Sequence, residues 1–80
     1  MATFSVHVEF MATLRRQKNQ PREFTKDVAE GTKIRDLLKE YFTVEELRMI
    51  HVLVHDLRVN LEYILNPNDR LFVTIPIGGG

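Results

Sequence analysis

The last three residues of the sequence, Gly78, Gly79 and Gly80, offer a group that could take part in chemistry. Glycine has no Cβ, so the backbone of such a tail can enter a slot that excludes every other residue. At its tip lies the α-carboxylate of Gly80, which is ionised at neutral pH because its pKa is roughly 3.5. A carboxylate is a nucleophile toward phosphorus and becomes an acyl donor only after activation. The tail therefore predicts a partner that activates the terminal carboxyl.

The residues just before the glycines support the same interpretation. Pro76 lacks an amide donor, so strand pairing should stop there. We expect the segment that threads into the partner to comprise Pro76, Ile77, Gly78 and Gly79. A glycine end that frays in solution and has no function is the alternative.

Composition narrows the class of partner. The 80 residues carry 11 basic and 11 acidic side chains, so the net charge is zero, which argues against nucleic acid or a membrane as partner. Without cysteine there is no thiol nucleophile, disulfide or thiolate zinc site. No apolar run approaches the ~18 residues of a membrane span. The N-terminus is patterned as a strand and not as a signal peptide, so we expect a cytoplasmic protein.

The elements that must position the tail begin with a hairpin. Apolar and polar residues alternate from Phe4 to Leu14, which predicts a long strand with one buried face. A polar loop over 15–22 leads to a second strand over 23–29. Because this loop is short, we expect the two strands to pair as an antiparallel hairpin.

A helix should follow, with Thr32 as a plausible N-cap. Apolar residues then recur at helical spacing and predict a helix of about three turns; they are Ile34, Leu37, Leu38, Tyr41 and Phe42. Thr43 and Glu46 have the spacing of a capping box, which predicts a short helical turn through Arg48.

Three further extended segments complete the chain. Ile50, Val52 and Val54 alternate as a third strand, a turn is expected at Asp56-Leu57, and residues 58–60 form a short return. A turn at 66–69 precedes the last strand. A helix with one apolar face must pack against the apolar face of the sheet, so the sequence predicts an α+β roll with a single core layer. We expect one domain over 1–77 and a flexible tail over 78–80.

Three other sets of residues bear on function: an apolar set, a pair of histidines and a pair of glutamates. Leu53, Phe72 and Met11 are out of phase with the buried positions, which favours a partner-docking patch on the outer face of the sheet; a satellite cluster under residues 57–65 is the alternative.

His51 and His55 would lie roughly 13 Å apart on one strand, too far to share a metal, so we expect no metal site. Glu45 and Glu46 are better explained by helix capping than by acid–base catalysis.

Four segments resemble the small sulfur carriers of the ubiquitin-like β-grasp fold (the MoaD/ThiS family), and most of all the small subunit of molybdopterin synthase. Phe10-Met11-Ala12-Thr13-Leu14-Arg15 is similar to the end of that subunit's first strand, and residues 31–38 to its helix start. Residues 65–71 and the terminal Ile75-Pro76-Ile77-Gly78-Gly79-Gly80 match its last turn and its tail. The family usually has Asn-Gly where this chain has Asp56-Leu57.

The resemblance implies a ubiquitin-like β-grasp roll, with a mixed sheet of four to five strands, parallel first and last strands, and one main helix on one face. It also implies a carrier and not an enzyme. An E1-like adenylyltransferase would consume ATP to adenylate Gly80, and sulfur would then replace the adenylate to leave a thiocarboxylate. No cofactor would be bound stably. The second partner would be the large subunit of a molybdopterin synthase, in molybdenum cofactor biosynthesis, or a thiazole synthase. The alternatives are a thiamine-pathway carrier, a ubiquitin-like modifier conjugated through Gly80, and a plain interaction domain.

Overall fold

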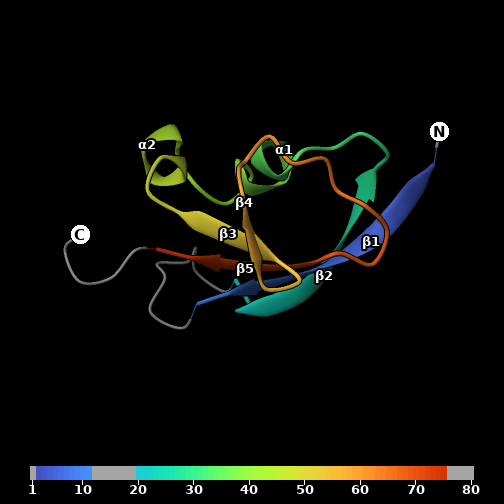
Figure 1. The fold of residues 1–80 in the computed structure, drawn as a ribbon, viewed down its shortest axis with the longest axis horizontal. Helices are drawn as coiled ribbons and strands as arrows, with labels where there is room; N and C mark the ends of the chain where they lie inside the picture. The colour runs from blue at the N-terminus through green and yellow to red at the C-terminus, as the bar shows by residue number, and fades with distance from the viewer. Residues whose placement is uncertain (1, 12–19, 76–80) are drawn as a thin grey trace.

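The computed structural model describes residues 2–11 and 20–75. Within them a five-stranded sheet has the order β2-β1-β5-β3-β4, and two short helices lie on the same side of it (Figure 1). The elements in chain order are β1 Thr3–Phe10, β2 Glu23–Ala29, α1 Ile34–Leu38, α2 Val44–Leu47, β3 His51–Val54, β4 Leu57–Val59 and β5 Arg70–Thr74. Strands β1 and β5 are parallel and the other pairs are antiparallel, so the sheet is mixed, as expected.

The hairpin follows the alternation of the sequence. In β1 the side chains of Val6, Val8 and Phe10 are buried, whereas the residues between them are partly exposed. β2 has the predicted bounds and pairs with β1 in antiparallel register, from Thr3 opposite Ala29 to Glu9 opposite Glu23. The strand predicted to reach Leu14 ends at Phe10, and residues 12–19 lie outside the described part of the chain.

The helix after the hairpin is shorter than predicted and starts one residue later. Lys33, not Thr32, is the N-cap, with an extended backbone. The reason is a long-range contact: Lys33 forms a β-bridge with Ile64, and the amide of Leu65 donates to the Thr32 carbonyl at 2.9 Å. Regular helix ends at Leu38 and continues as turns, so the predicted apolar stripe still faces the core.

The capping box at the second helix is confirmed. The amide of Glu46 donates to Thr43 Oγ1 at 3.1 Å, and the amide of Thr43 donates to Glu46 Oε1 at 2.8 Å. The capping box gives partners to two backbone amides at this helix start, which helps to stabilise a helix of only four residues. In place of one main helix, the described residues thus have two short ones on the same face.

Two tight turns orient the last strands. The hairpin between β3 and β4 turns at His55 and Asp56, one residue earlier than predicted, because Leu57 already pairs with Val54. His55 and Asp56 have φ of 51° and 70°, as a type I′ turn requires. The predicted turn at 66–69 is present: the amide of Asp69 donates to the Asn66 carbonyl at 3.2 Å, and its buried carboxylate accepts from the Asn66 amide at 2.9 Å.

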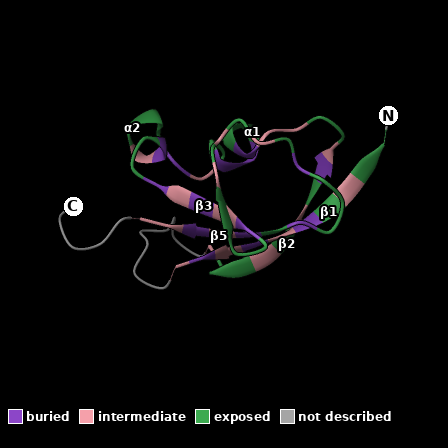
Figure 2. Ribbon diagram, viewed as in Figure 1, coloured by how far each residue is buried: buried purple, intermediate pink, exposed green. Residues whose placement is uncertain are grey.

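The core lies between the helices and the inner face of the sheet (Figure 2). Its buried apolar residues are Val6, Val8, Phe10, Val28, Ile34, Leu37, Leu38, Phe42, Leu47, Ile50, Val52, Val54, Leu65, Leu71 and Val73. Phe10 lies at the centre of an aromatic group and makes edge-to-face contacts with Phe24, Tyr41 and Phe42 at centroid distances of 5.6, 5.9 and 5.4 Å. Edge-to-face contacts are favourable because the positive edge of one ring meets the negative face of another.

Candidate functional site

The strand that leads to the tail is anchored in the middle of the sheet. β5 lies between β1 and β3, and Ile75, which follows it, packs against the core. The hydroxyl of Thr74 donates to the sulfur of Met11 at 2.8 Å. The residues predicted to thread and react, Pro76, Ile77, Gly78, Gly79 and Gly80, lie outside the described residues. The chain therefore passes to its tail directly from a central, well-packed strand.

The outer face of the sheet carries an apolar pair. Leu53 of β3 and Phe72 of β5 lie directly opposite each other, and both are partly exposed. Because neither side chain belongs to the core or packs against it, their apolar surface is available to a partner. We refer to Leu53 and Phe72 as the outer-face pair.

Met11, the third residue of the predicted docking patch, has different surroundings. It follows the end of β1, packs against the core and touches Thr74. The structure thus places Leu53 next to Phe72 and gives Met11 a packing contact of its own, next to the start of the tail.

A shallow concavity of ≈ 330 Å³ adjoins the outer-face pair. It is lined by His7, Glu9, Leu53, His55, Asp56, Arg70, Leu71 and Phe72. Its lining combines charged side chains of both signs with the apolar side chains of Leu53 and Phe72, a mixture common where one protein docks on another.

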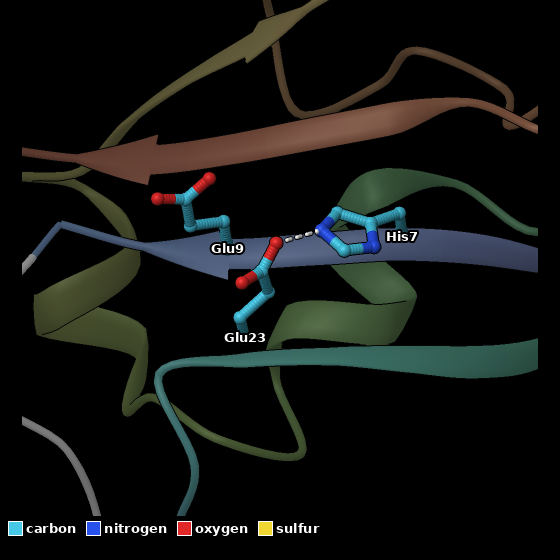
Figure 3. Close-up of side chains that lie close together, drawn as sticks. All are labelled: His7, Glu9 and Glu23. Carbon is cyan, nitrogen blue, oxygen red and sulfur yellow. Dashed lines mark hydrogen bonds and ion pairs between the residues drawn. The ribbon is translucent and has the colours of Figure 1, made fainter.

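Three polar side chains from the hairpin meet beside this concavity (Figure 3). Nε2 of His7 lies 2.6 Å from Oε2 of Glu23, and one donor atom from each of His7, Glu9 and Glu23 lies within 4.8 Å of the other two. Glu9 and Glu23 are directly opposite across the hairpin, where like charges repel. This edge of the outer face therefore favours a cation, such as a lysine or arginine of a partner or a metal ion.

Sequence reasoning missed this cluster because it considered only the spacing of His51 and His55 along one strand and did not compare His7 with the carboxylates of the neighbouring strand. The structure gives each histidine a different partner: His7 meets Glu23, His51 meets Arg58 at 3.1 Å, and His55 meets Asp69 at 3.2 Å. The available signal was the hairpin register, which places residues on the two strands opposite each other once one pair is known.

Comparison with known proteins identifies the fold. No protein-family model and no curated protein sequence matches the chain. Among solved structures it is similar to SAMP1 from Haloferax volcanii, with a TM-score of 0.71 and 20% sequence identity over 95% of this chain and 99% of that chain. Neither described helix is long and apolar enough to cross a membrane. Together with the mixed five-stranded sheet, the similarity shows that the chain has the ubiquitin-like β-grasp fold.

Proposed function

We propose that the chain is a sulfur carrier that is activated at Gly80 and delivers sulfur in molybdenum cofactor biosynthesis. The observation that carries the proposal is the combination of a β-grasp fold with a central strand that runs into Pro76 and three glycines. A rigid strand presents the tail at a fixed point, and the glycines offer no side chain to obstruct a narrow active site.

Activation would proceed in two steps, adenylation of the carboxylate and replacement of the adenylate by sulfur. A carboxylate oxygen of Gly80 attacks the α-phosphorus of ATP on an E1-like adenylyltransferase, and pyrophosphate leaves. A sulfide-level sulfur nucleophile then forms a bond to the carbonyl carbon, and AMP leaves with the oxygen. The product is a thiocarboxylate, whose sulfur would be transferred on the large subunit of a molybdopterin synthase.

The chain is the substrate of these steps and not their catalyst. Its sequence contains no glycine-rich phosphate loop followed by lysine and serine or threonine, so ATP must be held by the partner. The outer-face pair and the concavity beside it are the surface that would hold the carrier while its tail reaches the partner's active site.

A ubiquitin-like modifier conjugated through Gly80 is the second candidate. It is supported by the ubiquitin-like β-grasp fold and by the same three C-terminal glycines. Both functions need the same activated glycine, and they differ in the fate of the acyl group. A thiamine-pathway carrier would share the thiocarboxylate and differ in the large partner, a thiazole synthase.

Intact-mass spectrometry of the chain purified from its native host separates the two candidates. We expect a free species in which one carboxylate oxygen is replaced by sulfur, because a thiocarboxylate is a stable anion that can await its acceptor. A blot of the same lysate should show the free chain without higher conjugates. A ladder of conjugates that is lost on deletion of Gly80, with no thiocarboxylate, would contradict the carrier and establish the modifier.

The docking surface is tested by a charge on the outer-face pair. Phe72→Arg should weaken binding to the adenylyltransferase by at least ~2 kcal/mol, about thirtyfold, if Phe72 is an interface anchor. Isothermal titration calorimetry measures the affinity, and thermal unfolding should be little changed because the side chain faces outward. Leu57→Arg is the matched control, since Leu57 is 71% exposed and lies on the edge strand. Equal affinities of the two variants would show that the partner docks elsewhere.

A further inference from the structure

A second and larger cavity lies at the β4 edge of the sheet, next to α2. Its volume is ≈ 550 Å³, within the ~300–1,000 Å³ typical of small-molecule sites. Residues of α2, β3, β4 and the segment 60–62 line it, together with Arg35 from α1. It does not share a residue with the concavity beside the outer-face pair.

Three arginines give this cavity its charge. Arg35, Arg48 and Arg58 all line it, and all three are exposed. Glu62 is the one carboxylate among the described lining residues, and it is already paired: Arg35 Nε lies 2.6 Å and Lys33 Nζ 3.0 Å from its two oxygens. Hydrogen bonds from Lys33 and Arg35 hold the pKa of the Glu62 carboxyl below its usual value. The carboxylate therefore stays ionised and paired with these two cations. Arg48 and Arg58 have no carboxylate within ion-pair distance among residues 2–11 and 20–75.

The contact of Arg58 is informative. Its Nη2 lies 3.1 Å from Nε2 of His51. A guanidinium can only donate hydrogen bonds, so Nε2 of His51 is the acceptor in this contact. The contact holds the Arg58 guanidinium at the wall of the cavity without neutralising its charge, because the imidazole nitrogen that accepts from it carries no negative charge.

The floor of the cavity is apolar. Leu47 and Val52 are buried there, and Val59 and Leu61 are partly exposed. A ligand that fills the site therefore needs an anionic end for the arginines and an apolar or flat body for the floor. Arginine suits phosphate best, because its planar fork matches two phosphate oxygens at once.

We propose that this cavity binds an organic phosphate, with the phosphate held by Arg48 and Arg58 and an apolar or aromatic body resting on Leu47, Val59 and Leu61. This site is independent of the tail chemistry proposed above. It uses the opposite end of the sheet from the His7–Glu9–Glu23 cluster and none of the residues of the outer-face pair.

The test is an NMR titration of the uniformly ¹⁵N-labelled chain with AMP and with phenyl phosphate. We expect saturable shifts of the amides that line the cavity, with adenosine and inorganic phosphate each binding at least about tenfold more weakly, since each lacks one half of the ligand. The double variant Arg48→Gln/Arg58→Gln should lose at least about tenfold in affinity, because it removes both charged hydrogen-bond donors proposed to hold the phosphate.

Arg70→Gln provides the matched control, because it removes the same charge from the other concavity and should leave the affinity unchanged. Arg58→Lys, which keeps the charge but not the fork, should weaken binding less than the double variant and serves if that variant unfolds. The proposal is overturned if neither phosphate shifts the cavity amides, if adenosine or inorganic phosphate binds as tightly as AMP, or if the double variant binds as well as the parent.

Discussion

Removal of Gly80 is expected to abolish activation of the chain by its adenylyltransferase while its unfolding midpoint stays nearly unchanged. The carboxylate of Gly79 would then end one residue short, about 3.5 Å from the required position, and in-line attack on phosphorus tolerates far less than that. Stability should not respond, because the buried core consists of residues between Val6 and Val73. ATP–pyrophosphate exchange with the adenylyltransferase from the same organism measures the loss directly.

Addition of one alanine after Gly80 is the complementary variant. It keeps every residue of the chain and moves the carboxylate outward by the same distance, so exchange should be lost again. Phe72→Arg separates docking from chemistry, since its defect should be overcome at a high concentration of the partner. Normal exchange by the truncated chain would contradict activation at Gly80 and leave an idle tail as the better interpretation.

Phe10→Ala is expected to cost about 3–5 kcal/mol of folding free energy, the largest loss from any single truncation considered for this domain. Phe10 is 1% exposed and touches aromatic rings from β2 and from the turn that follows α1. Its removal would leave a cavity between the sheet and the helical layer that none of these rings can fill without leaving its own contacts. Small domains have a free energy of unfolding of only about 5–15 kcal/mol, so the variant would lose a large part of its stability.

Urea denaturation followed by circular dichroism measures this loss. Phe72→Ala is a suitable control because it removes the same ring from the neighbouring strand, on the opposite face of the sheet, and should cost far less. Similar losses for the two variants would mean that the outer-face pair contributes to folding as much as the core does. The docking function assigned to that pair would then be in conflict with its energetics.

Much of the fold could be predicted from local pattern. The spacing of apolar residues in the sequence indicates which face of an element is buried. This spacing predicted the buried faces of β1 and β2 and of the helix that contains Ile34, Leu37 and Leu38. The helix start could not be predicted in this way, because the backbone of Lys33 is held extended by Ile64, thirty-one residues away in the chain. The turn at His55 and Asp56 was misplaced by one residue, since neither is among the usual Asn-Gly pairs of such turns.

The site divides in the same manner. Gly80 and the residues proposed to thread into a partner form a local motif, which can be recognised without a structure. The cluster of His7, Glu9 and Glu23 depends on the register of a hairpin. The arginine-lined cavity depends on how several separate elements of the chain pack against one another. Neither has a characteristic spacing, because register and packing are decided by the whole core and not by the residues that line the site.

The parallel pairing of the first and last strands has a consequence for how the chain folds. Residue 7 lies beside residue 70, so the central strand pair closes a loop that contains nearly the whole domain. Contacts of such long range slow folding, because the entropy of loop closure is lost before the contact is formed. During synthesis the sheet also stays divided into its two edge hairpins until β5 leaves the ribosome. The glycine tail begins four residues after β5 ends, so every strand of the sheet is made before the carboxylate that the proposed activation requires.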